Sequence, residues 1–153
     1  MIPQFRRTLD RCDELIKRVG SYELDDFLVS ASAQHACVLL SGVLETSSQE
    51  LLSSYCVRKA DPKVGAYSSK RVSGFNNANP QKILDLIRDF DPAWCDELEG
   101  FWADRIKDHI GSIVKNRHNI AHGRPNEVSM VRIMEWRKSL GEFVDKLHEI
   151  TSR

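Results

Sequence analysis

Apolar residues recur at steps of three and four along most of this chain, which is the spacing of one face of an α-helix. Residues 2–19 carry the first such face, and residues 133–150 carry the last one. In the last segment the steps of three and four alternate, as is typical of helices in a bundle. No convincing run alternates apolar and polar residues as a half-buried strand would. The pattern therefore predicts an all-α fold.

The middle of the chain carries three further helical segments. A long one is predicted from about residue 21 to 58, and its centre, residues 36–44, is apolar on nearly all sides. Such a helix is buried on several sides, so we expect it at the centre of a bundle. A short helix begins after Asn79, where Asn is followed by Pro, and Asp91-Pro92 can start another turn in the same way. A fourth main helix runs from about residue 97 to 122, with Gly123 as its predicted C-cap.

Residues from about 60 to 78 contain glycines, asparagines and a proline but few apolar anchors, which predicts a longer loop. The expected fold is thus an up-and-down helical bundle of about five helices with one longer loop at about 60–78. The length of 153 residues is that of one domain, so we expect a single helical domain over residues 1–153.

Composition predicts where in the cell the protein is found but does not predict its function. Lys and Arg total 22 and so do Asp and Glu, so the net charge does not indicate a nucleic-acid or membrane partner. The four cysteines lie far apart without metal-ligand spacing, which predicts reduced, mostly buried thiols. The first residues lack the apolar core of a signal peptide, and no apolar run approaches the length of a membrane span. We expect a cytoplasmic protein with no membrane association.

Local charge is uneven, because residues 115–124 hold three cations, two histidines and two asparagines but no acid. In a chain of zero net charge, this is where a phosphate would bind. We therefore predict that Lys115, Asn116 and Arg124 contact phosphate or RNA. The alternative is a solvated basic helix end.

Arg117 lies four residues after Ile113 and three after Val114, so the spacing predicts that it continues the apolar stripe of its helix. A guanidinium in that place keeps its charge and needs a carboxylate, a phosphate or a partner chain. Glu45, on the central helix, is the candidate internal partner. The alternative is a purely structural Arg–Glu bond, or an arginine whose guanidinium extends along the helix to reach solvent.

His122 lies in the last turn of the same helix. It can interact with the helix dipole, or it can act as a general acid or base. His118 is four residues earlier on the same face, which is a possible metal-binding pair. The neighbouring cations would repel a metal ion and no third ligand is nearby, so we predict no metal and no cofactor. Metal-dependent hydrolysis through the two histidines remains the alternative.

Arg117 and His122 are five residues apart, so on an ideal helix they point about 140° away from each other. They converge only if the helix relaxes near Gly123 or if two copies of the chain meet. RNA cleavage by attack of the 2′-hydroxyl needs a base and an acid in the same step, and one histidine cannot be both. A symmetric homodimer through this helix would bring two histidines and two arginines to one phosphate.

These residues resemble a known family. The segment Arg117 to His122, read in its wider form from Asn116 to Gly123, resembles the motif of the HEPN superfamily and of its RiboL-PSP-HEPN group. In that motif an Arg precedes a His by a few residues, and the His lies in Ala-His-Gly. Residues 40–45 and 79–84 resemble the second helix of the group and the entry to its short helix. The resemblance covers about residues 20–150.

The resemblance implies a HEPN-like bundle that dimerises through the motif helices, and a metal-independent endoribonuclease of the toxin or anti-phage defence type. It implies that Arg117 stabilises phosphate charge and that His122 transfers protons. His118 and Asn119 would be the polar residues of the motif, and Glu45 would orient Arg117.

Arg124 stands where one branch of the superfamily has the Tyr to which a partner enzyme attaches nucleotides, so we do not expect that modification here. An antitoxin or a defence-system partner is implied as well. The alternative function is a non-catalytic HEPN module that binds nucleotide, RNA or protein.

Overall fold

A computed structural model describes residues 1–153 as six α-helices without strands. This confirms the predicted all-α bundle. The helices are α1 (Gln4–Ser21), α2 (Asp26–Lys59), α3 (Pro62–Val72), α4 (Pro80–Phe90), α5 (Pro92–Ala121) and α6 (Met130–Thr151).

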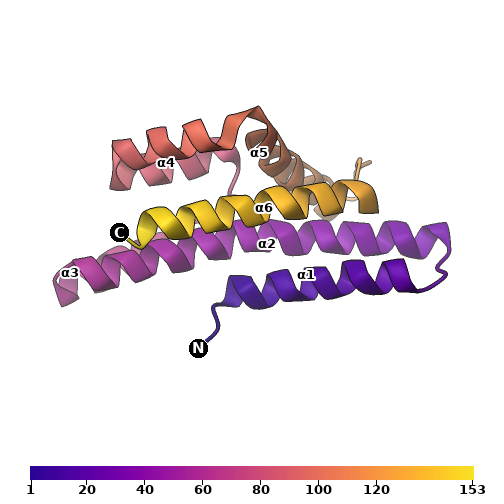
Figure 1. Cartoon of the computed structure of the whole chain (residues 1–153), viewed down its shortest axis with the longest axis horizontal. Helices are drawn as coiled ribbons and strands as arrows, with labels where there is room; N and C mark the ends of the chain where they lie inside the picture. Colours follow the sequence, from indigo (N-terminus) through magenta and orange to yellow (C-terminus); the bar gives the residue numbers. More distant parts are fainter.

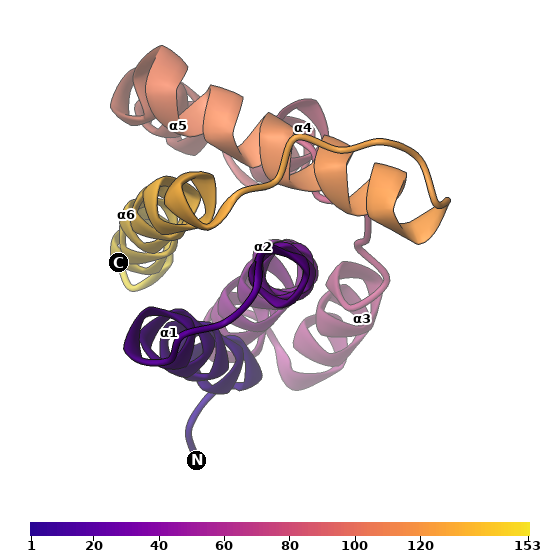
Figure 2. The same ribbon diagram turned by 90° about the vertical axis from the view of Figure 1, so that its right-hand side faces the viewer.

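The bundle is built around α2, a helix of 34 residues that contacts α1, α3, α5 and α6 (Figures 1 and 2). The carboxylate of Asp25 caps its N-terminus by accepting from the backbone N–H of Leu28 at 2.8 Å. By length and composition alone, α2 is long and apolar enough to cross a membrane. In this fold its apolar side chains pack against four other helices, as predicted for the central helix.

The predicted loop at about 60–78 is wrong in its first part, where α3 forms. Asp61 accepts from the N–H of Lys63, and Pro62 occupies the first helical position, so the helix has a well-formed start. Gly65 lets α3 approach α2 closely, because a Cβ atom there would lie 3.0 Å from the carbonyl oxygen of Cys56. The apolar face of α3 is too small for its period to be visible in the sequence: Val72 is buried, but Val64 and Tyr67 are exposed.

The fourth main helix also differs from the prediction. It begins at Pro92 instead of about residue 97, with Asp91 as its N-cap, and it breaks at Ala103, where φ is 45° and ψ is −164°. The first part of α5 runs beside α4, and α5 then turns across the bundle (Figures 1 and 2). Neither glycine nor proline occupies the break, so the sequence does not indicate it.

The buried apolar side chains form one cluster of 29 residues. All six predicted core positions of α6 are buried, namely Ile133, Trp136, Leu140, Phe143, Leu147 and Ile150. The four cysteines are free and buried, as predicted. Burial raises the pKa of the Cys37 thiol to about 12, and its Sγ donates to the carbonyl oxygen of Ile113 at 3.5 Å, which joins α2 to the second part of α5.

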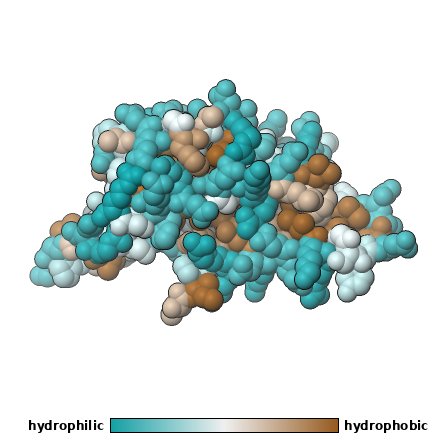
Figure 3. Space-filling model, in the orientation of Figure 1, coloured by the Kyte–Doolittle hydropathy of each residue, from teal (hydrophilic) through white to brown (hydrophobic).

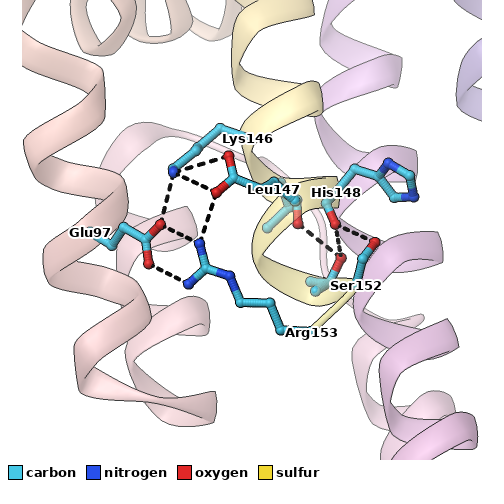
Figure 4. Close-up of polar contacts among 8 residues, drawn as sticks. Glu97, Lys146, Leu147, His148, Ser152 and Arg153 are labelled. Carbon is cyan, nitrogen blue, oxygen red and sulfur yellow. Dashed lines mark hydrogen bonds and ion pairs between the residues drawn. The ribbon is translucent and has the colours of Figure 1, made fainter.

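Ion pairs close the end of the bundle where the first part of α5 meets the C-terminal end of α6. Arg153 donates to both carboxylate oxygens of Glu97, at 2.7 and 2.8 Å, and Lys146 lies 2.8 Å from the same carboxylate (Figure 4). Elsewhere, the face of the molecule in Figure 3 is mostly hydrophilic with separate apolar areas. Exposed apolar side chains include Phe27, Val131 and Met134.

Candidate active site at the C-terminal end of α5

The predicted motif lies at the C-terminal end of α5 and in the turn that follows. His122 is the C-cap residue, and Gly123 adopts a φ of +63°, which glycine tolerates far better than other residues. The N–H of Gly123 donates to the carbonyl of Ile120 at 3.2 Å, and the N–H of Arg124 donates to that of Asn119 at 2.8 Å. These two bonds form a Schellman motif, so the predicted glycine cap is confirmed. The chain then returns across α5 to α6 (Figure 2).

Asn116, not Arg117, continues the buried stripe of α5. The side chain of Asn116 is 5% exposed, whereas Arg117 is exposed, so the predicted inward position of Arg117 is wrong. After Ile113 a helix can turn either the third or the fourth following residue toward its neighbours, and here it is the third. The face that contains Arg117 is open to solvent.

Asn116 holds the loop that follows the motif. Its Nδ2 donates to the carbonyl of Ser112 at 2.8 Å, and its Oδ1 accepts from the N–H of Glu127 at 2.9 Å. Both ends of the amide are therefore used within the chain. Asn116 therefore has a structural role in this chain, and its predicted contact with phosphate stays a prediction.

The expected pair between Glu45 and Arg117 is absent. Glu45 accepts instead from the backbone N–H of Asn77 at 2.7 Å, which fixes the loop before α4 against α2. The side chain of Arg117 makes no ion pair or hydrogen bond within this chain. Its guanidinium is thus available to a phosphate or to another chain.

His118 and His122 are both exposed, and their ring centroids are 4.4 Å apart with the planes tilted by 55°. The four-residue spacing therefore brings the two imidazoles together, as predicted. No cluster of three or more His, Cys, Asp or Glu side chains that could hold a metal ion occurs in the structure. The pair can exchange protons with a ligand bound at this surface.

The cations of the motif are unpaired. Lys115, Arg117 and Arg124 are exposed, and none lies within 4.0 Å of a carboxylate. Like-charged groups held close together without a counter-charge attract anions, and the end of the helix adds no competing acid. The positive charge of this segment is therefore open to solvent, and phosphate binding there stays a prediction.

A polar cavity of about 280 Å³ adjoins the motif on the side of the returning loop. Lys115, Asn116 and Asn119 line it from α5. It is completed by residues that the sequence did not single out: Ser112, Pro125, Asn126 and Glu127. The available signal was Pro125-Asn126, a turn-forming pair that redirects the chain toward α5.

Glu127 brings a carboxylate to this cavity, but Arg132 partly neutralises it at 3.2 Å. A cavity lined by amide, hydroxyl and ammonium groups and by no hydrophobic side chain other than Pro125 suits a polar ligand. All of the predicted site residues except Glu45 therefore lie at the C-terminal end of α5 or in the turn that follows it.

Comparison with known proteins gives one match. A family model described as RiboL-PSP-HEPN matches residues 6–153. Neither the curated proteins nor the solved structures include a match to this chain.

Proposed function

The chain belongs to the RiboL-PSP-HEPN family, and from this premise we propose that it is a metal-independent endoribonuclease of the toxin or anti-phage defence type. The observation that carries the proposal is that Arg117, His118 and His122 are all exposed at the end of α5, with no internal carboxylate bound to the arginine. Groups that the fold leaves without partners are free to act on a ligand.

In the proposed reaction, a base removes the proton from the ribose 2′-hydroxyl, and the 2′-oxygen attacks the adjacent phosphorus. The bond from phosphorus to the 5′-oxygen breaks, and an acid gives that oxygen a proton. His122 of one chain takes one of these roles and His122 of a second chain takes the other. Arg117 stabilises the negative charge that develops on the phosphate oxygens. Lys115, Asn119 and Arg124 bind the RNA on either side, and His118 supports His122.

The proposal includes a homodimer through the C-terminal part of α5. Val131 and Met134 support it, because these apolar side chains are exposed on the first turns of α6, directly after the motif loop. A second copy seated here would bury them while bringing two motifs together. We further propose one domain over residues 1–153, a cytoplasmic location and control by an antitoxin or a defence-system partner.

The test compares induced expression of the wild type with His122→Ala, followed by examination of total RNA for cuts. We expect cleavage and growth arrest with the wild type and neither with the variant, because the proton-transfer group is lost. His148→Ala is the matched control, since His148 is also exposed but lies on α6. Identical RNA and growth for wild type and His122→Ala would leave the non-catalytic binding module as the better description.

Chelator separates the proposal from metal-dependent hydrolysis. Purified protein should cut RNA equally with and without an excess of chelator. Loss of cleavage in chelator, restored by added divalent metal, would favour a metal held by His118 and His122.

A further inference from the structure

A second cavity lies away from the motif, between α3, the loop after it and the C-terminal half of α4. It measures about 450 Å³, within the range of small-molecule sites. Its lining is mostly apolar and includes three aromatic rings, Tyr67, Phe75 and Phe90, with the guanidinium of Arg71 as its one charged group. Flat rings beside a cation are the elements from which proteins build binding sites for nucleobases.

Arg71 is held in place at this cavity. Its Nε donates to the hydroxyl of Tyr67 at 3.0 Å, and its guanidinium carbon lies 5.2 Å from the centre of the Tyr67 ring. Tyr67 is nevertheless 61% exposed, so the ring and the guanidinium present one joint surface to solvent. A base stacked on such a surface would have its phosphate within reach of Arg71.

The charge around the cavity favours a polyanion. The segment that contains every residue of the lining, residues 59–91, holds two more cations than acids. The cations are Lys59, Lys63, Lys70, Arg71, Lys82 and Arg88, and the acids are Asp61, Asp85, Asp89 and Asp91. Asp61 and Asp91 cap helices and Asp85 pairs with Arg88, whereas the other five cations pair with no carboxylate. The chain as a whole is neutral, so this segment has a local excess of positive charge.

The two positive regions lie on the same side of the bundle. Both α3 and the C-terminal end of α5 lie on one side of α2 in Figure 2, and Figure 1 shows them separated along the long axis of the bundle. The start of α4, which follows the loop after α3, packs on α5: a Cβ atom at Gly111 would lie 3.7 Å from the ring of Pro80. Gly111 is six residues, or about 9 Å of helix, before Arg117.

We propose that the cavity lined by Tyr67, Arg71 and Phe75 binds a nucleobase of single-stranded RNA, with Arg71 and Lys70 on the adjoining phosphates. The inference rests on the proposed function in that the bound strand is the one cleaved at the motif. The inference adds an RNA-binding surface that is separate from the reacting groups. This surface would bind single-stranded RNA more tightly than duplex RNA. An apolar peptide would fill the cavity as well, but the unpaired cations around it favour a polyanion.

The test measures binding of a short fluorescent single-stranded RNA to full-length His122→Ala protein, which should not cut it. Adding Tyr67→Ala or Arg71→Ala should weaken binding by roughly tenfold or more, because each removes a stacking or phosphate contact. Tyr67→Phe keeps the ring and should bind far better than Tyr67→Ala. Tyr22→Ala and Lys17→Ala are matched controls, since both residues are exposed outside this region.

A photoreactive uridine in the same RNA should crosslink to the peptide that contains Tyr67 or Phe75. Unchanged affinity in Tyr67→Ala with no crosslink in this region would overturn the inference, whether or not the protein cuts RNA. The inference would also be overturned if Tyr67→Ala and Arg71→Ala lost no more RNA affinity than Lys17→Ala does. Such small losses of affinity would reflect the net charge of the protein alone. Binding that depends on Tyr67 in a wild-type protein without nuclease activity would support the inference and count against the proposed catalysis.

Discussion

Arg117 and Asn116 are neighbours in the sequence with opposite surroundings in the structure. Asn116 is buried with both ends of its amide bonded, whereas Arg117 is exposed and unpaired. The fold thus separates two tasks within the motif. The asparagine fixes the backbone that carries the motif and its loop, which leaves the arginine free to meet a ligand.

Replacing Asn116 by alanine should destabilise the protein by about 1–2 kcal/mol, because the N–H of Glu127 loses its acceptor and a buried contact disappears. The exchange of that amide hydrogen should also become faster. Urea unfolding and hydrogen exchange measure the two effects. Asn119→Ala is the control, since the Asn119 side chain makes no hydrogen bond within the chain, and its effect should stay within about 0.5 kcal/mol. Equal stability of both variants would contradict the clamping role of Asn116.

At the scale of elements, the break in α5 divides it into two parts with different packing partners. Its first part packs beside α4 and carries Glu97, and its second part crosses the bundle with the motif at its end. The break falls on Ala103, whose positive φ is unfavourable for any residue with a Cβ atom. Trp102, just before it, is buried with its Nε1 unpaired, so the junction carries a second unfavourable feature.

Ala103→Gly should therefore stabilise the protein by roughly 1 kcal/mol, since glycine adopts positive φ without the steric cost. In a continuous helix the same change would destabilise by about 1 kcal/mol, because glycine is a poor helix former. The sign of the change in unfolding free energy thus reports whether the break exists. Gly100 and Gly111 flank the break within α5, and Gly100→Ala is the control for an exposed helical position, where the order of stability should be reversed.

At the scale of the whole molecule, polar contacts tie elements that are distant in the sequence. Arg137 of α6 donates to both carboxylate oxygens of Asp13 on α1, at 2.7 and 2.9 Å. After the other end of α6, Arg153 donates to both carboxylate oxygens of Glu97. Hydrogen bonds from Arg153 and Lys146 lower the pKa of Glu97 to about 2. This carboxylate is charged over the whole range in which most proteins stay folded.

Because the pKa of Glu97 is lower in the folded state, its contribution to stability is present above the ordinary value of about 4.5 and is lost as pH falls toward 2. Glu97→Gln should be less stable than the wild type at pH 7. The difference should shrink below pH 4.5 and vanish near pH 2. Chemical unfolding at a series of pH values measures it, with Glu99→Gln as a control whose difference stays small. A difference in unfolding free energy that does not depend on pH would mean that the ion pairs of Glu97 do not contribute to stability.

Local patterns in the sequence predicted the motif and every helix except α3. Apolar periodicity located the core of α2, α5 and α6, and Asn79 and Gly123 marked helix ends, because capping depends on residues within one turn. The exposed His118–His122 pair also followed from spacing alone, since residues four apart on a helix are neighbours.

Four features depend on contacts between distant parts of the chain and were not predicted: which residue of the motif turns inward, what Glu45 binds, where α5 breaks and that α3 is a helix. Positions three and four residues along a helix lie on either side of the same line, so the neighbouring element selects between them. Here the loop that contains Glu127 engages Asn116, and the loop that contains Asn77 engages Glu45. These partners are 11 and 32 residues away, beyond the reach of any local pattern.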